Sequence, residues 1–170
     1  CKGGGATLLI TVDCGITNYD EIAHANILGV DIIVTDHHTP PETLPEAFAI
    51  LNPRQKGDEY PFKDLCGCGV AFKFIQAVIA EGKKQGGFEI HDGWEKWLLD
   101  MVAIATVSDM VPLRGENRTL AYFGLKVLRK SPRPGIVHLF RSLYADQRFA
   151  TEDDIGFTIG PRINAASRMD

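Results

Sequence analysis

The fold is decided by residues 6–36, which read ATLLITVDCGITNYDEIAHANILGVDIIVTD. Residues 6–12 and 30–35 are continuous apolar runs rich in β-branched side chains, typical of strands buried on both faces of a parallel sheet. Residues 19–28 between them show helical spacing and end at Gly29, a favourable residue directly after a helix. Strand, helix and strand in this order predict a βαβ unit with a right-handed crossover.

The rest of the chain predicts one more short strand, residues 48–51 (FAIL), and then several helices. The predicted helices are residues 69–82, 93–107, 117–130 and 134–144. In the segment 93–107 apolar residues recur at helical spacing, so we expect a buried helix in which Trp97→Ala costs roughly 3–5 kcal/mol. The fold class is therefore α/β, a parallel sheet with flanking helices followed by a mainly helical part.

The composition is that of an ordinary globular chain, but the charge is unevenly distributed. The 170 residues include 18 Lys+Arg and 22 Asp+Glu, a formal net charge of −4. Residues 1–113 hold 8 basic and 16 acidic residues, whereas residues 114–148 hold 8 basic and 2 acidic ones. An acidic part that attracts cations, followed by a basic stretch, suits a phosphate polyanion as substrate. A solvated helix face is the simpler explanation of the basic stretch on its own.

The apolar pattern argues against membrane and secretory classes. No apolar run approaches the roughly 20 residues that a membrane span requires, and the sequence does not open with a signal-peptide pattern. Among the four cysteines one pair is closely spaced, Cys66 and Cys68, and that spacing does not match a zinc site. We therefore expect a reducing, cytoplasmic compartment and no membrane partner.

Acidic and imidazole side chains gather where the first two strands end. Asp13 follows the first strand, and Asp36, His37 and His38 follow the second. Ligands of open α/β sheets bind outside the carboxyl ends of strands, and neighbouring strands lie about 4.8 Å apart. Both carboxylates can thus face one crevice, and oxygen and imidazole ligands favour Mn²⁺, Mg²⁺, Fe²⁺ or Zn²⁺. The alternative is that each Asp caps a helix and that the histidines are surface residues of a turn.

Asp109 is a further candidate ligand. It follows the apolar segment 93–107, and a carboxylate at the carboxyl end of a helix needs a positive charge nearby. A metal ion would supply that charge, although for a lone residue a solvated Asp is the simpler account. The remaining histidines are interpreted as ordinary residues: His24, His91 and His138.

Several motifs, taken together and in order, resemble one family. They are Asp13-Cys14-Gly15, Asp36-His37-His38, the segment 108–113 (SDMVPL) and the segment 160–168 (GPRINAASR). With these motifs the chain resembles the DHH phosphoesterase superfamily, and within it the RecJ-type exonucleases that are specific for single strands. The segments 67–73 (GCGVAFK) and 116–118 (ENR) are also similar to that branch, so the resemblance covers essentially the whole chain.

The resemblance implies phosphodiester hydrolysis at a centre of two divalent metal ions, Mn²⁺ or Mg²⁺. It assigns metal ligands to Asp13, which would bridge the ions, and to His37 and Asp109. It implies that Asp36 orients or ligates and that His38 contacts the scissile phosphate. The residues that it places near the substrate are Arg162, Asn164 and Arg168.

The resemblance also implies partners and a domain plan. Residues 1–148 would form the DHH core, and residues 149–170 would begin a helix leading to a further domain. The family's glycine-rich first motif, which carries two or three Asp, is expected before Asp13, where this sequence has only CKGGGA. We therefore expect this chain alone to bind metal weakly and to have little activity.

The leading hypothesis is a 5′→3′ exonuclease on single-stranded DNA in repair and recombination, with a single-strand-binding protein and a helicase as possible partners. Its direction of digestion comes from the resemblance alone. The alternatives are a DHH oligoribonuclease or cyclic-dinucleotide phosphodiesterase, a catalytically silent DHH scaffold module, and an α/β metal-binding domain without a nucleic acid role.

Overall fold

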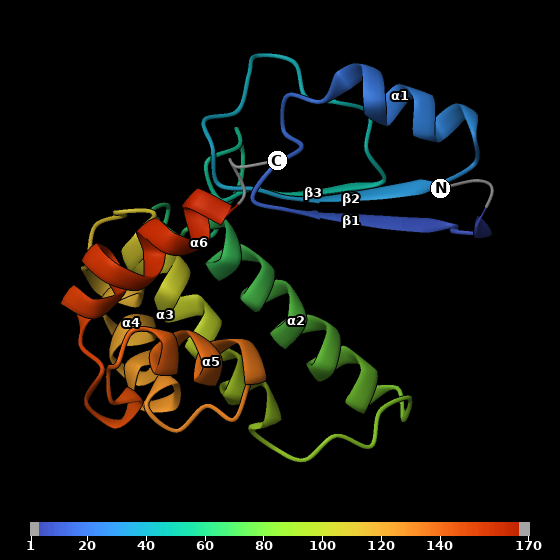
Figure 1. Ribbon diagram of the computed structural model, residues 1–170. Coiled ribbons are helices and arrows are strands. Elements are labelled where there is room, and N and C mark those ends of the chain that lie inside the picture. The colour runs from blue at the N-terminus through green and yellow to red at the C-terminus, as the bar shows by residue number, and fades with distance from the viewer. Residues whose placement is uncertain (1–3, 167–170) are drawn as a thin grey trace. The chain divides into compact units, whose positions relative to one another are not determined.

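The computed structural model describes residues 4–166 (Figure 1). The chain forms two compact units, Cys1–Phe74 and Ile75–Asp170. The helix α2 (Gly67–Lys84) begins in the first unit and ends in the second. The division expected at residue 148 concerns the domain plan of the family, and it stays a prediction.

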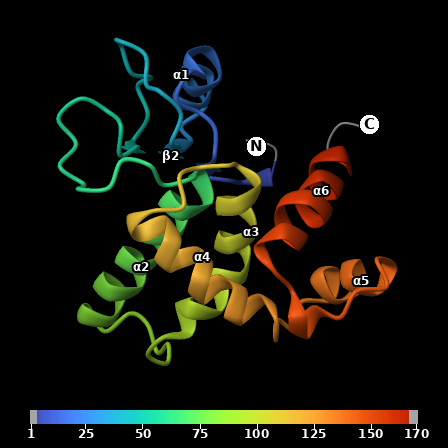
Figure 2. The same ribbon diagram turned by 90° about the vertical axis from the view of Figure 1, so that its left-hand side faces the viewer.

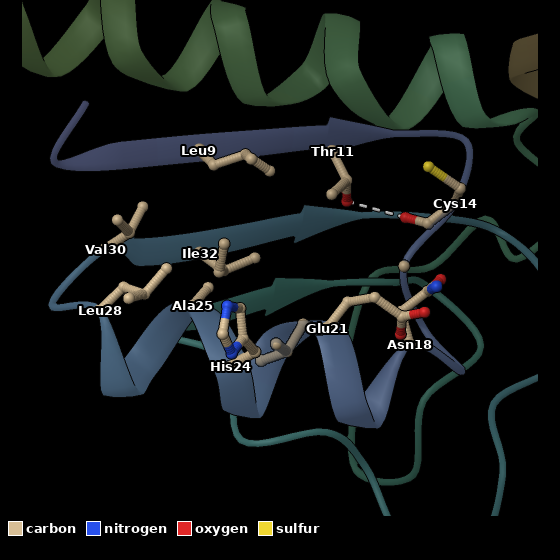
Figure 3. Close-up of a pocket in the computed structure, with 12 residues that line it drawn as sticks. Leu9, Thr11, Cys14, Asn18, Glu21, His24, Ala25, Leu28, Val30 and Ile32 are labelled. Atoms are coloured by element: carbon tan, nitrogen blue, oxygen red, sulfur yellow. Dashed lines mark hydrogen bonds between the residues drawn. The ribbon is translucent and has the colours of Figure 1, made fainter. Parts of the chain in front are cut away.

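The first unit is a three-stranded parallel sheet with one helix against it. Its strands are β1 (Leu8–Val12), β2 (Asp31–Thr35) and β3 (Ala49–Leu51), in the spatial order β1-β2-β3. Helix α1 (Tyr19–Ile27) connects β1 to β2, as the sequence predicts, and lies along one face of the sheet (Figures 1 and 3). Gly29 follows this helix with a φ of +70°, the left-handed conformation that glycine adopts without strain.

The expectation of burial on both faces is only partly correct for β2, whose second face has a buried Thr35 but a half-buried Ile33, and it is wrong for β1. Ile32 and Val34 of β2 are buried, and they pack with Ile22 of α1 and with Val30. In β1 exposure alternates, and Leu8, Ile10 and Val12 are each about half exposed. The reason is that successive side chains of a strand point to opposite faces: Leu9 packs against the core cluster that includes Ile22 of α1, whereas Leu8, Ile10 and Val12 lie on the other, less covered face.

A cavity of about 390 Å³ lies between α1 and the first two strands. Figure 3 shows Leu9 and Ile32 on the sheet side and Glu21 and His24 on the helix side. Apolar residues supply most of its walls, which accords with its position over the core of the unit.

The second unit is helical. Its elements after α2 are the 3₁₀ helix η2 (Trp94–Leu98), α3 (Leu99–Ser108), α4 (Gly115–Leu128), α5 (Pro134–Ser142), the 3₁₀ helix η3 (Gln147–Phe149), the π-helix η4 (Asp154–Ile159) and α6 (Gly160–Ala166). The core of this unit includes Ala103 and Ile104 of α3, Leu128 of α4, Phe140 of α5 and Ile155 of η4. Helices α2, α4 and α5 correspond to the predicted helices 69–82, 117–130 and 134–144, with boundaries that differ by at most two residues.

Helices α3 and α4 approach each other closely (Figure 2). A Cβ on Gly124 of α4 would lie 2.3 Å from the carbonyl oxygen of Leu99 and 2.5 Å from the Cβ of Ala103. Only glycine fits at this crossing, because any larger residue would push the two backbones apart.

The start of α3 is held by Asp100, a buried carboxylate that accepts hydrogen bonds from Ser131 Oγ (2.6 Å) and Arg133 Nε (2.8 Å).

The predicted helix over residues 93–107 is wrong in its first part. The chain forms η2 there and continues as α3 from Leu99, and Trp97 is 48% exposed. The expected core loss of 3–5 kcal/mol for Trp97→Ala is therefore also wrong, because that range applies to a fully buried side chain.

Among residues 4–166 no helix has the length and apolar character needed to span a bilayer.

Candidate metal centre

The carboxyl ends of β1 and β2 carry the candidate ligands. The parallel register pairs Val12 with Thr35, so the residues that follow them, Asp13 and Asp36, lie at the same edge of the sheet. The ladder continues one step further, since the Asp13 N–H donates to the Thr35 carbonyl (2.9 Å) and the Asp36 N–H donates to Leu51 of β3 (3.0 Å). The hydrogen bonds between the three strands therefore fix the backbone positions of Asp13 and Asp36.

Asp13, His37 and His38 form one cluster. Each offers a ligand atom, and these atoms all lie within 4.8 Å of one another. Nε2 of His37 lies 3.1 Å from Oδ1 of Asp13. Asp13 has a φ of +64°, in the left-handed region that non-glycine residues rarely adopt, and its side chain is 53% exposed. Backbone strain of this kind concentrates at functional sites, and here it turns the carboxylate toward the histidines.

Asp36 is buried and engaged with its own surroundings. Its Oδ1 accepts hydrogen bonds from the N–H groups of His37 (2.8 Å) and His38 (3.2 Å), and its Oδ2 accepts one from Ile16 (3.1 Å). Burial alone would raise the pKa of Asp36, but the hydrogen bonds of the His38 ring and of these N–H groups outweigh it and lower the pKa below its usual value. Asp36 is therefore a charged anchor that holds the histidine pair in place.

The His38 ring is oriented from two sides. Its Nδ1 lies 2.7 Å from Oδ1 of Asp36, and because an ionised carboxylate only accepts, Nδ1 is the donor in this contact and Nε2 is the ring nitrogen that Asp36 leaves available. Its backbone carbonyl accepts a hydrogen bond from Nδ2 of Asn52 (2.9 Å), a buried residue that directly follows β3. Asn52 was not among the predicted site residues. Its place at a strand carboxyl end, like that of Asp13 and Asp36, was the signal that could have identified it.

Gly67, the first residue of α2, packs against Asp13. A Cβ at this position would lie 2.3 Å from Oδ1 of Asp13 and 2.6 Å from its Cα and Cβ. The close approach is possible only because residue 67 has no side chain. The sequence analysis noted the segment 67–73 for its family resemblance and missed this contact, which joins residues more than fifty positions apart.

The cluster fits a hard or borderline divalent cation. It combines a carboxylate oxygen with imidazole nitrogens and contains no thiolate, a ligand set suited to Mn²⁺ and compatible with Mg²⁺ or Zn²⁺. The charged, hydrogen-bonded Asp36 contacts the ring of His38 and the backbone N–H of His37, so it fixes the ring of the first and the main chain of the second. The residues present therefore meet the chemical requirements of a metal centre.

The other predicted site residues belong to the second unit. Asp109 is exposed and directly follows α3, where its N–H donates to the carbonyl of Ala105 (2.9 Å). Arg162 and Asn164 are exposed on α6, and Nη1 of Arg162 donates to the carbonyl of Thr158 (2.9 Å). Arg168 lies outside the described residues. Their roles as metal ligand and substrate contacts stay predictions.

The strand-end cluster, formed by an Asp-Cys-Gly turn and an Asp-His-His triplet, defines the class. Residues 5–106 match the model of the DHH family, N-terminal domain, and the chain belongs to this family. It is similar to the single-stranded-DNA-specific exonuclease RecJ of Salmonella typhimurium, with 44% identity over 99% of this chain and 30% of the relative. The same-named proteins of Bacillus subtilis and Escherichia coli are 42% and 43% identical. The chain thus spans about a fifth to a third of the length of these relatives.

Solved structures of RecJ have the same fold. A crystal structure of exonuclease RecJ bound to manganese superposes with a TM-score of 0.77 at 34% identity, over 96% of this chain and 39% of the other. RecJ from Thermus thermophilus in complex with Mn²⁺ matches equally well, over 23% of its length. The same protein in complex with Mg²⁺ matches with a TM-score of 0.66. The expected parallel sheet with flanking helices and the expected family are both confirmed.

Proposed function

We propose that this chain forms the catalytic DHH part of a metal-dependent exonuclease that hydrolyses phosphodiester bonds in single-stranded DNA. The observation that carries the proposal is the cluster of Asp13, His37 and His38 at the strand ends, supported from behind by Asp36. The similarity to RecJ proteins, including structures that hold Mn²⁺ or Mg²⁺, supports the same reading.

The residues take separate roles in this proposal. Asp13 and His37 would hold metal, and Asp109 is a further predicted metal ligand; two divalent ions would activate a water and stabilise charge on the phosphate. Asp36 positions the histidines, because its carboxylate is already occupied by the N–H groups behind them. His38 presents Nε2, the atom opposite its bond to Asp36, to the scissile phosphate.

The substrate contacts and biological setting complete the proposal. The guanidinium groups of Arg162 and Arg168 and the amide of Asn164 are donors suited to phosphate oxygens. Digestion would run 5′→3′ in repair and recombination, with a single-strand-binding protein and a helicase as partners. Among the described residues of the first unit this proposal assigns only Asp13 and His37 to metal, so we expect the 170-residue chain alone to bind metal weakly and to cleave little.

The decisive experiment is Mn²⁺-dependent cleavage of 5′-labelled single-stranded DNA by the longer protein that carries this chain. His37→Ala should abolish cleavage with little loss of thermal stability, whereas His138→Ala, at an exposed position on α5, should leave cleavage unchanged. Normal cleavage by the His37 variant would refute the site. Hydrolysis of dinucleotides without cleavage of long strands would replace the exonuclease by a DHH enzyme for short substrates. If neither the unmodified protein nor any variant cleaves DNA or dinucleotides, with or without Mn²⁺, the result would favour a catalytically silent DHH scaffold module.

A further inference from the structure

The solvent-exposed face of α4 combines aromatic and basic side chains. The opposite face is buried through Asn117, Leu120, Ala121, Gly124 and Leu128. On the outer face Arg118, Tyr122 and Lys126 follow one another at four-residue spacing and therefore line up along the helix, with Phe123 beside them. Tyr122 and Phe123 are each about half exposed.

These side chains contact one another. The rings of Tyr122 and Phe123 meet edge to face, with centroids 5.2 Å apart, and Nζ of Lys126 lies 4.2 Å from the centre of the Tyr122 ring and 5.4 Å from that of Phe123. The hydrogen bond and positive charge of Lys126 lower the pKa of Tyr122. The rings are thus held on the surface by a cation rather than by burial in the core.

The same chemistry continues beyond the end of α4. Lys130 directly follows the helix, and its Nζ lies 5.1 Å from the centre of the Trp97 ring in η2. Trp97 is about half exposed, like Tyr122 and Phe123. Tyr122, Phe123, Lys126, Lys130 and Trp97 together are called the aromatic–basic strip.

Charge distinguishes the strip from an ordinary solvated helix face. Residues 117–145 contain no Asp or Glu, so no acidic side chain of this segment neutralises the strip. Exposed helix faces usually mix both signs of charge, and protein interfaces are depleted in lysine. Rings and ammonium groups side by side match a partner that carries flat apolar faces and negative charges in alternation.

We propose that the aromatic–basic strip binds single-stranded nucleic acid, with bases stacked on its rings and the flanking phosphates on its lysines. Stacking on exposed aromatic residues beside cations is how proteins hold single strands without reading sequence. A duplex hides its base faces and would meet only the charges of Lys126 and Lys130. This inference rests on the proposed function, because it adds a binding track to a single-strand enzyme.

Binding is measured by the fluorescence anisotropy of a labelled oligothymidylate in the presence of EDTA, so that no cleavage is required. The double variant Tyr122→Ala/Phe123→Ala should weaken binding by about 5- to 140-fold for each stacked base that is lost. The matched control is Tyr144→Ala/Phe149→Ala, which removes two exposed aromatic residues of the same unit outside the strip and should bind like the parent. Unchanged thermal unfolding shows that both variants are folded.

The lysines give an independent readout. Lys126→Gln should reduce the slope of log Kd against log salt by about 0.7, the value for one phosphate contact on a single strand. The proposal is overturned if the parent chain does not bind oligothymidylate, if the double variant binds as the parent does, or if it loses duplex and single-strand binding equally. In the longer protein, strip-dependent binding without Mn²⁺-dependent cleavage would support the strip and refute the proposed nuclease activity, whereas cleavage with binding that does not depend on the strip would support the nuclease and refute the strip.

Discussion

Replacing Gly67 with alanine should weaken divalent-metal binding as well as destabilise the fold, because the new side chain would collide with Asp13. The new Cβ would lie 2.3–2.6 Å from three atoms of Asp13, whereas ordinary contacts begin at 3.4 Å, so Asp13 must retreat by about 1 Å. Metal–ligand distances tolerate only about 0.2 Å, and disturbing the support of a ligand typically costs 10- to 100-fold in metal affinity. We expect a loss of that size in Mn²⁺ affinity.

The cost to stability should be of similar size, because the Cβ would also lie 2.6 Å from the Cα of Asp13 and the backbone at the end of β1 must shift, although the half-exposed Asp13 side chain can move outward. Overpacking of this kind costs about 1–3 kcal/mol in the free energy of unfolding. Isothermal titration with Mn²⁺ measures the affinity, and thermal unfolding measures the stability of the same samples.

The matched control for this prediction is Gly69→Ala, one half-turn further along α2. A Cβ there meets the Leu65 side chain at 3.4 Å and Cys66 Sγ at 3.6 Å, both ordinary contacts, so Mn²⁺ binding should stay as in the parent. Parent-like Mn²⁺ affinity in the Gly67 variant would refute the reasoning. Equal losses in both variants would assign the effect to the helix as a whole instead of to its contact with Asp13.

Two further predictions concern packing and charge. Gly124→Ala should lower the free energy of unfolding by about 1–3 kcal/mol or more, because its Cβ meets α3 backbone at 2.3 Å, whereas Gly135→Ala, with nothing within 4 Å, should change it by less than about 1 kcal/mol. Equal effects of the two in urea unfolding would contradict the close crossing of α3 and α4. Burial alone would raise the pKa of Asp58, but hydrogen bonds from the Tyr60 N–H and Lys63 lower it below 3.8. Its stabilisation is therefore present above the unfolded pKa and is lost as pH falls through the folded one. Asp58→Asn should cost at most about 1 kcal/mol near pH 7 and nothing near pH 2, and a deficit independent of pH would contradict this.

Local pattern determined most of the secondary structure. The β-branched run of β2 and the helical spacing of α1 identify these elements because both depend on near neighbours in the chain. The errors fell on β1 and on residues 93–98, where burial depends on what packs from elsewhere. An apolar run predicts a strand but does not reveal which of its faces another element covers.

For the metal centre, the sequence by itself determined the kinds of ligand and their places at the ends of strands. Asp13, Asp36 and the histidine pair could be identified because parallel strands bring their carboxyl ends to one edge. Only the tertiary structure decided which of these side chains come together and which of them is buried behind the others. Asp36 is the buried one, and the contacts of Asn52 with His38 and of Gly67 with Asp13 join distant parts of the chain. These features depend on distance and solvent exposure, which a linear pattern does not contain.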